Sequence, residues 1–529
     1  MEATHRELRV TEPRGSERVG DRMVKYAVRP RQVAASLRDR AGSRRRRGYR
    51  EWGRFSDEPP DESNWWAAEP WWFPAGTPPR PHTKVLVHID GQETFRAAWQ
   101  AIRNAKHSVW LADWAMSADM DLVRGEDRAT IAAVARAKGS GYSVLNLLTD
   151  VAAEVDVRVL LWRGSLLFRP RATLARRNLK RLRRANPAMH GLVDKHVRIA
   201  HCHHQKIIVV DGRIAFVGGL DMTDHDIDRW DTTAHPMRAG FNWHDLCFQL
   251  EGEAASDVAR NFAQRWHAVG HDNLQAPPAP ADDPGHGVPA QIIRTIPAGN
   301  YPFAPRGEYG IAWAYRQALG QARRFIYLEN QYLWSPAVVN ELIAALRRND
   351  DPTFRIVLVL PAKPNIGKRD TDLHVRQLLE ADGDRGRVLI FTLYTARAEE
   401  RLAWAYKPVY VHAKVAIVDD LWCTVGSANL NERGLEGDSE INVQVLDSEL
   451  ARNLRLRLWA EHLGVPPEAL AALPPHEAID TLWAPRGDAA AAIIHGRGGP
   501  LPSMAVRYEL GAMPGDLAVG ALQAALLDG

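Results

Sequence analysis

The stretch "HHQKIIVVDGRIAFVGGLDM" (203–222) decides the fold, because it returns in similar form as "YVHAKVAIVDDLWCTVGSANL" (410–430). Both copies follow H-x-K-x-x-x-x-D-x-x-x-x-x-x-G-[GS], and aligned residues are 208 positions apart (412 − 204). Three pairs coincide: His204 with His412, Lys206 with Lys414, and Asp211 with Asp419. One such motif is weak evidence of function, whereas two in register indicate a duplicated unit.

Three other segments also occur twice, in the same order. They are "AIRNAKHSVWLADW" (101–114) and "ALGQARRFIYLENQY" (318–332), "VDVRVLLW" (155–162) and "PTFRIVLVL" (352–360), and "VARNFAQRWHAVG" (258–270) and "LARNLRLRLWAEHLG" (450–464). Short apolar strands alternate with segments of helical spacing in both copies. We therefore predict an α/β protein of two similar α/β/α units (84–272 and 288–465), each a mixed sheet flanked by helices. A pseudo-twofold axis would relate the units, with the active site at their interface.

The motif predicts chemistry at one end of a buried strand. His and Lys two residues apart point to the same face of a strand, and the apolar runs 207–210 and 415–418 anchor it. The Asp that follows begins a turn, which favours a structural role for Asp211 and Asp419 within the motif. Two lysines can hold phosphate oxygens while one histidine attacks phosphorus and the other protonates the leaving oxygen.

The duplicated motif resembles that of the phospholipase D superfamily over about residues 84–465. Further segments resemble its phosphatidylcholine-cleaving branch: "FVGGLDM", "RWDT", "WHDLCFQLEG", "IYLENQY", "GSANLNERGLEGDSEI" and "LRLRLWAEHLG". The resemblance implies a phospholipase D, without a cofactor, that hydrolyses a glycerophospholipid such as phosphatidylcholine to phosphatidic acid and the headgroup alcohol. A primary alcohol in place of water would give transphosphatidylation. The lipid-binding targeting domains of the larger eukaryotic enzymes are not evident.

The resemblance also implies a role for each residue of the two His-Lys pairs. His204 would be the nucleophile and form a covalent phosphohistidine. His412 would protonate the departing alcohol and then deprotonate water. Lys206 and Lys414 would hold the non-bridging phosphate oxygens, and because the motif is symmetric, only the resemblance distinguishes the two histidines.

Further residues match supporting positions of the family. Asp245 and Glu440 match carboxylates that orient the two histidine rings, as in hydrolase triads. The positions expected to support the phosphate or the site are Gly219, Ser427, Asn429, Glu329 and Asn330. Asp221 stands where the family's first copy can have Asn, so we do not expect it to donate to phosphate.

The cluster "HCHH" (201–204) raises the question of a metal site, because histidine and cysteine are zinc ligands. Alternation along a strand would put Cys202 and His204 on one face and His201 and His203 on the other. The second copy keeps only His412. We therefore expect no metal at this stretch.

Alternative functions stay open. A metal-independent nuclease or other phosphodiesterase would use the same motifs, with the basic segment 169–187 along a nucleic-acid backbone. An anionic membrane would attract that segment equally well, and a solvated helix would have the same composition. A cardiolipin-synthase-like phosphatidyltransferase shares the chemistry, although such enzymes commonly carry N-terminal membrane helices, which we do not find. Because both motifs are intact, a non-catalytic binding protein is disfavoured.

The 529 residues carry a formal net charge of +4, with 45% hydrophobic and 25% charged residues, as in ordinary globular proteins. Three cysteines, Cys202, Cys247 and Cys423, are too few for a disulfide framework. No apolar run is long enough to span a bilayer. We expect a cytoplasmic protein that meets phospholipid peripherally at a membrane surface, with nucleic acid not expected as a partner and the oligomeric state left open.

Segments outside the repeats carry no recognisable chemistry. Residues 1–83 form a basic, Trp- and Pro-rich extension, whose arginine block is usually solvated in proteins. An alternative places four tryptophans at a lipid interface, namely Trp65, Trp66, Trp71 and Trp72. Residues 273–287 are predicted to be a linker, and 466–529 a C-terminal extension of unknown role.

Overall fold

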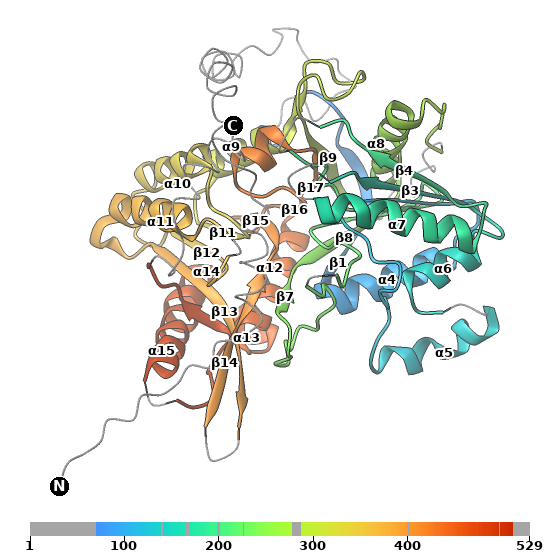
Figure 1. Cartoon of the computed structure of the whole chain (residues 1–529). Helices are drawn as coiled ribbons and strands as arrows, with labels where there is room; N and C mark the ends of the chain where they lie inside the picture. Colours follow the sequence, from blue (N-terminus) through green and yellow to red (C-terminus); the bar gives the residue numbers. More distant parts are fainter. Residues whose placement is uncertain are drawn as a thin grey trace, which may run out of the picture.

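The computed structural model describes residues 70–511, apart from gaps at 139–140, 165–168, 198–200, 226, 278–286, 365, 400–402 and 497. The arginine block, Trp65 and Trp66 lie outside the described residues, as does most of the predicted linker. Two α/β halves stand side by side, the first blue to green and the second yellow to red (Figure 1). Within the described part, no helix has both the length and the apolar character needed to cross a membrane.

The first half is built on one mixed sheet. In spatial order its strands are β1 (Arg80–Ile89), β8 (Leu246–Glu251), β6 (Ile214–Gly218), β5 (Ile207–Val210), β2 (Ser108–Asp113), β3 (Asp156–Trp162) and β4 (His190–Asp194). The pairs from β1 to β2 are antiparallel, and β2, β3 and β4 are parallel.

The second half repeats this order and these directions. Its strands are β9 (Val288–Ile296), β17 (Glu440–Leu446), β16 (Trp422–Gly426), β15 (Lys414–Val418), β11 (Phe325–Asn330), β12 (Arg355–Val359) and β13 (Val388–Ala398). The short strand β10 (Glu308–Tyr309) extends it on β9, and β14 (Trp404–Val411) and the short β18 (Ala505–Arg507) extend it on β13. The predicted duplication is therefore confirmed at the level of sheet topology.

Helices cover both faces of each sheet. The outer helices are α4 (Asp90–Arg103), α6 (Val144–Val151) and α7 (Arg169–Ala185) in the first half, and α9 (Gly310–Gln321), α10 (Pro336–Arg348) and α11 (Lys368–Asp382) in the second. On the inner face, α8 (Glu253–Gly270) and α12 (Ser448–Leu463) contribute to one apolar core shared by both halves. The predicted α/β/α architecture is thus confirmed. A further helix, α5 (Asp127–Lys138), lies between β2 and α6 in the chain.

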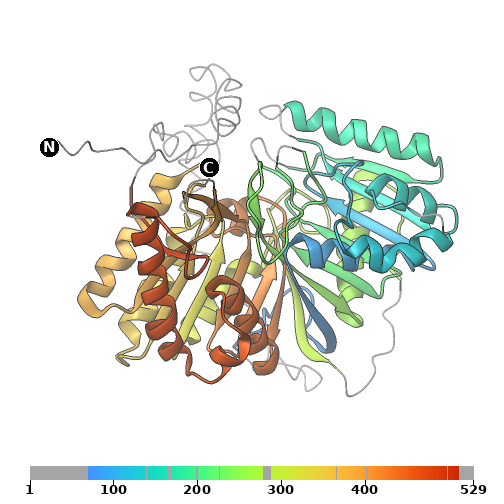
Figure 2. The same cartoon turned by 90° about the horizontal axis from the view of Figure 1, so that it is seen from below.

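Backbone pairing joins the halves. Strand β1 pairs with β9, and β7 (Asn242–His244) of the first half runs parallel to β14 of the second. Figure 2, seen from below, shows the two sheets meeting along this seam. Because both junctions hold strands of different repeats in register, the residues beside the seam have fixed neighbours across it.

The segments flanking the repeats pack on the second half. Trp72 is only 2% exposed, and the Phe73 ring lies 5.7 Å from that of Trp313 in α9. A lipid-interface position for Trp72 is therefore wrong, because the side chain is almost fully buried. After α12, the chain forms α13 (Pro467–Ala471), α14 (Pro475–Ala478), the π-helical turn η5 (Ile479–Trp483) and α15 (Ala484–His495) before β18.

The aspartates of the two motifs fasten strands together. Asp211 accepts hydrogen bonds from the backbone N–H groups of residues 106, 107 and 108, and Asp419 from those of residues 323, 324 and 325. Both have a positive φ, 55° and 58°, which the turn requires. Each aspartate thus holds the end of a hairpin strand, β5 or β15, against the start of β2 or β11.

Replacing Asp419 by alanine is expected to lower the free energy of unfolding by about 3 kcal/mol, because three backbone donors lose a charged acceptor. Asp211→Ala is expected to cost less, since residues 106 and 107 are exposed and water can replace the carboxylate. Urea unfolding monitored by circular dichroism measures both. Equal, negligible losses would contradict this role.

Candidate active site

The two motif histidines face each other across the seam between the halves. Their ring centroids are 6.5 Å apart, with an interplanar angle of 60°. The other half holds each backbone, since the N–H of His204 donates to the carbonyl of Ser439 (2.9 Å) and that of His412 to His244 (2.8 Å). The predicted convergence of the two motifs is therefore present in the structure.

The carboxylates that hold the rings are exchanged between the repeats. Nδ1 of His204 lies 3.0 Å from Oε1 of Glu440, which comes from the second half. Nδ1 of His412 lies 2.6 Å from Oδ2 of Asp245, which comes from the first. Both carboxylates were expected from the sequence, but their exchange between the repeats was not. Each repeat thus completes the site of the other.

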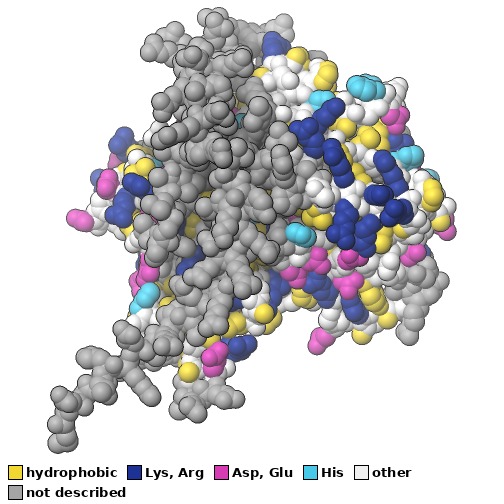
Figure 3. Space-filling model, viewed as in Figure 1, with side chains coloured by type: hydrophobic (Ala, Val, Ile, Leu, Met, Phe, Trp, Pro, Cys, Tyr) yellow, Lys and Arg dark blue, Asp and Glu magenta, His cyan; other side chains and the backbone are white. Residues whose placement is uncertain are grey.

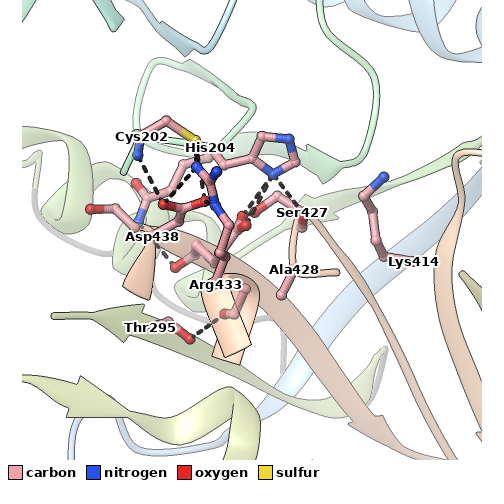
Figure 4. Close-up of polar contacts among 12 residues, drawn as sticks. Cys202, His204, Thr295, Lys414, Ser427, Ala428, Arg433 and Asp438 are labelled. Carbon is pink, nitrogen blue, oxygen red and sulfur yellow. Dashed lines mark hydrogen bonds and ion pairs between the residues drawn. The ribbon is translucent and has the colours of Figure 1, made fainter. Parts of the chain in front are cut away.

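The environment of His204 fixes its tautomer. Besides Glu440, its Nδ1 lies 3.0 Å from the backbone carbonyl oxygen of Ser427 (Figure 4). A carbonyl oxygen can only accept, so Nδ1 carries the proton. In the neutral ring, Nε2 then keeps its lone pair, and it has no hydrogen-bond partner among the described residues. Such a nitrogen is suited to attack an electrophile.

His412 has the opposite environment. Its Nδ1 faces Asp245 and also lies 3.0 Å from Nζ of Lys414, a donor. Burial raises the pKa of Asp245 to about 7, and burial together with Lys414 holds the pKa of His412 well below its usual range. Below about pH 7 the carboxyl of Asp245 holds a proton, which it can donate to Nδ1 of His412. The Nε2 atom of His412 then carries the hydrogen and can donate it.

Both lysines lie beside their histidines, as the two-residue spacing predicts. Nζ of Lys206 donates to the carbonyl of His204 (2.7 Å), and Nζ of Lys414 donates to the carbonyl of His412. Both side chains are buried. Burial lowers the pKa of Lys414 to about 7. These two cations are positioned to hold an anion between the histidines.

The two lysines have unlike surroundings. Lys206 lies 3.5 Å from Asp221, and burial and Asp221 raise the pKa of Asp113 well above its usual range. Burial alone would raise the pKa of Asp221, but Lys206 and a hydrogen bond from Asp113 lower it. The corresponding residues of the second half are both asparagines. The first half thus holds its lysine with a carboxylate pair that shares one proton.

The asparagines of the second half divide into two roles. Asn330 accepts hydrogen bonds from the N–H groups of Leu430 and Tyr332, so it shapes the loop after β16. Asn429 is 7% exposed, and its Oδ1 has no hydrogen-bond partner among the described residues. Asn429 therefore keeps hydrogen-bonding capacity at the predicted phosphate position.

The small residue after each motif glycine accommodates a carboxylate. A Cβ atom on Gly219 would lie 2.3 Å from Oδ1 of Asp245. Its counterpart Ser427 instead donates its hydroxyl to Glu440. The pair expected to support phosphate thus positions the carboxylates that hold the histidines.

The motif aspartates lie away from this centre. Asp211 and Asp419 follow β5 and β15, whereas the histidines precede these strands. Each aspartate is therefore roughly 20 Å from the histidine of its own motif along an extended backbone. They do not face the histidines.

The other residues of "HCHH" contact structural partners. The backbone N–H of Cys202 donates to Asp438 (2.8 Å), and Nδ1 of His201 lies 3.1 Å from the same carboxylate (Figure 4). Nε2 of His203 lies 2.9 Å from Asp194. The four side chains do not converge on one point.

A second buried group of histidines and carboxylates lies beside the site, and it was not predicted from the sequence. Nε2 of His235 lies 3.1 Å from Asp90 and 3.2 Å from Glu461, and Nδ1 of His244 lies 3.1 Å from each of these carboxylates. These spacings suit the edges of a tetrahedron around a cation with bonds of roughly 2.0 Å. The group could hold a divalent cation.

The partners of this group extend to the predicted site residue Glu329. Its Oε2 lies 2.8 Å from Nε2 of His244 and its Oε1 lies 3.1 Å from Nε2 of His462. Burial alone would lower the pKa of His244, but the surrounding carboxylates raise it well above its usual range. Glu329 therefore contacts the histidine that precedes Asp245, not the phosphate position. Of these residues, the family-like segments "WHDLCFQLEG", "IYLENQY" and "LRLRLWAEHLG" contain His244, Glu329, and Glu461 with His462, whereas Asp90 and His235 lie in none of them.

Two family models match the repeats separately. One described as "Phospholipase D" matches residues 101–242, and one described as "Cardiolipin synthase, PLD-like domain" matches residues 315–460. Each match contains one His-Lys pair. The chain belongs to the phospholipase D superfamily. The crossed carboxylates therefore describe how a two-repeat member of this superfamily builds one site.

Curated relatives in the superfamily carry the name phospholipase D. Phospholipase D A of Dictyostelium discoideum is 26% identical over 491 residues, covering 76% of this chain and 37% of the relative. Phospholipase D alpha 4 of Arabidopsis thaliana is 27% identical over 504 residues, covering 72% of this chain and 64% of the relative. The chain thus spans less than two thirds of the length of either relative.

Two solved structures are also similar. Phosphatidylserine synthase of Haemophilus influenzae is 12% identical, with a TM-score of 0.46, covering 72% of this chain and 86% of that one. The phospholipase D family member Nuc of Salmonella typhimurium is 19% identical, with a TM-score of 0.24, covering 32% of this chain and 91% of that one.

The pKa values predict a pH dependence. Lys414, with a pKa of about 7, is charged below that pH, and the proton shared by Asp245 and His412 is lost over the same range. We expect kcat/KM for a phosphodiester substrate to fall as pH rises through about 7. Circular dichroism over the same range controls for unfolding. An activity that still increases towards pH 9 would contradict these protonation states.

Gly219→Ala tests the space around Asp245. The new Cβ would displace the carboxylate from His412, and we expect turnover to fall about 100-fold with the fold retained. Gly240→Ala is the matched control, because no atom lies within 4 Å of a Cβ there. Equal activity of both variants would show that the close approach of Gly219 to Asp245 does not matter.

Proposed function

We propose that this protein is a phospholipase D that hydrolyses a phosphatidylcholine-like glycerophospholipid to phosphatidic acid and the headgroup alcohol. The observation that supports this most is the pair of facing histidines, each held by a carboxylate of the other half, beside two buried lysines. The names of the curated relatives support the lipid substrate. The same chemistry with an alcohol acceptor would give transphosphatidylation.

In the first step, the Nε2 lone pair of His204 attacks phosphorus, and the bond from phosphorus to the headgroup oxygen breaks. That oxygen takes the hydrogen from Nε2 of His412, while the proton held by Asp245 moves to Nδ1. Lys206 and Lys414 hold the non-bridging oxygens as charge builds up on them. The product is a phosphatidyl group covalently bound to His204.

In the second step, Nε2 of His412 takes a proton from water, and the water oxygen attacks phosphorus. The bond between phosphorus and His204 breaks, its electron pair returns to Nε2, and phosphatidic acid leaves. When Nε2 accepts the proton of water, Nδ1 returns its own proton to Asp245, which restores the starting state. Both steps thus use only proton transfers to and from His412, so the proposed mechanism requires no cofactor.

A cardiolipin-synthase-like transferase is the second candidate, because the model that matches residues 315–460 carries that description. It would share the first step and use the hydroxyl of another lipid in place of water. We also propose a cytoplasmic location with peripheral access to membranes. The three buried free cysteines support a reducing compartment.

The roles of the histidines can be separated with a phosphatidyl ester of p-nitrophenol, whose leaving group needs no acid. With this substrate, His412→Ala is expected to accumulate a phosphatidyl group on His204 and release p-nitrophenol, since water activation is lost. His204→Ala should form no adduct. Intact-protein mass spectrometry detects the difference, and an adduct on the His204→Ala variant would overturn the assignment.

The substrate class is tested with phosphatidylcholine vesicles, a primary alcohol and a chelator. Phosphatidyl-alcohol from the wild type, but from neither histidine variant, is expected. Activity that needs an added divalent cation would contradict the cofactor-free account and implicate the group around His235 and His244. Absence of product with phosphatidylcholine, phosphatidylglycerol and phosphatidylethanolamine would exclude the lipid function.

A further inference from the structure

Helix α7 has two faces of different chemistry. Its buried residues follow helical spacing and pack against the first half: Ala175, Asn178, Leu179 and Leu182. Its exposed residues include five basic side chains: Arg176, Arg177, Lys180, Arg183 and Arg184. Figure 3 shows Lys and Arg side chains gathered over this part of the molecule. The helix therefore presents a basic face to solvent.

Within the described residues, most of these basic side chains form no ion pair with a carboxylate. Arg181 pairs with Asp119 (2.6 Å), and Arg183 donates to the carbonyl of Gly191. The remaining four basic side chains pair with no carboxylate among the described residues: Arg176, Arg177, Lys180 and Arg184. Cations four residues apart on a helix repel one another, so this face weakens the helix that carries it. A stripe of roughly 12 Å of uncompensated positive charge results.

The helix is tied to the candidate active site. Asn178 donates its side-chain amide to the carbonyl of Met116 and accepts from the N–H of Ala118. The same loop begins with Trp114, whose ring contacts that of His204 with centroids 6.0 Å apart. The basic face thus belongs to a helix fastened directly beside the nucleophile.

We propose that the basic face of α7 docks on an anionic phospholipid surface and holds the active site at the membrane. Phosphate and carboxylate headgroups supply the missing counter-charge. Phosphatidic acid, the product of the proposed function, is itself anionic. The physiological role of this docking rests on that proposed function. A nucleic acid is the weaker occupant, because single-strand binding surfaces interleave aromatic residues with cations. No exposed residue of the described part of α7 is aromatic.

The test is flotation of the full chain with phosphatidylcholine vesicles, with and without phosphatidylserine. The variant Arg176→Gln, Arg177→Gln, Lys180→Gln, Arg184→Gln is compared with the wild type. Each cation near an anionic surface contributes about a fivefold change in affinity, so we expect a loss of at least about 100-fold on anionic vesicles. Binding to pure phosphatidylcholine should change little, and added salt should weaken only the wild type.

A matched variant removes the same charge elsewhere: Arg306→Gln, Arg347→Gln, Arg376→Gln, Arg385→Gln. These four residues are exposed on the second half. The proposal predicts vesicle binding like that of the wild type. An equal loss in the matched variant, or undiminished binding of the α7 variant, would overturn it.

Two further measurements separate docking from catalysis. Turnover of a short-chain phosphatidylcholine below its micelle concentration should be the same in wild type and α7 variant, whereas turnover on anionic vesicles should fall. Vesicle binding needs no turnover, so it remains decisive if the proposed activity is absent. Binding of the α7 face to a DNA fragment by anisotropy, without binding to anionic vesicles, would show that the partner is nucleic acid.

Discussion

The exchange of carboxylates between the repeats is the constraint on which the rest of the structure depends. Glu440 holds His204 and Asp245 holds His412, so neither half contains a complete histidine site. The pairing of β1 with β9 and of β7 with β14 keeps these partners within hydrogen-bonding distance. Because buried carboxylates are costly without partners, the same contacts that build the site also favour association of the two halves.

Two motifs of identical spacing acquire different chemistry from their surroundings. The carbonyl of Ser427 makes Nδ1 of His204 a donor, whereas Lys414 and a carboxyl group with a raised pKa make Nδ1 of His412 an acceptor. The resulting tautomers match a nucleophile and an acid. A duplicated sequence can thus present two histidines in different states without any change in the residue types of the motif.

Three features could be predicted, because each depends on periodic or duplicated sequence segments. They are the repeat, the sheet architecture and the convergence of the two His-Lys pairs. The sequence could not reveal which carboxylate serves which histidine, since that depends on pairing across the seam. The group around His235 and His244 was missed for the same reason: its residues are far apart in the chain and share no spacing. Trp72 was named as a candidate for a lipid interface because composition alone does not reveal burial, whereas the residue is only 2% exposed in the structure.

The proposed division of roles between nucleophile and acid depends most on the opposite tautomers of His204 and His412. Long-range ¹H–¹⁵N spectra of the ¹⁵N-histidine-labelled protein at neutral pH report them directly. His204→Gln and His412→Gln assign the two signals among the 20 histidines of the chain. The account predicts a hydrogen on Nδ1 of His204 and on Nε2 of His412. The same tautomer at both positions would contradict it.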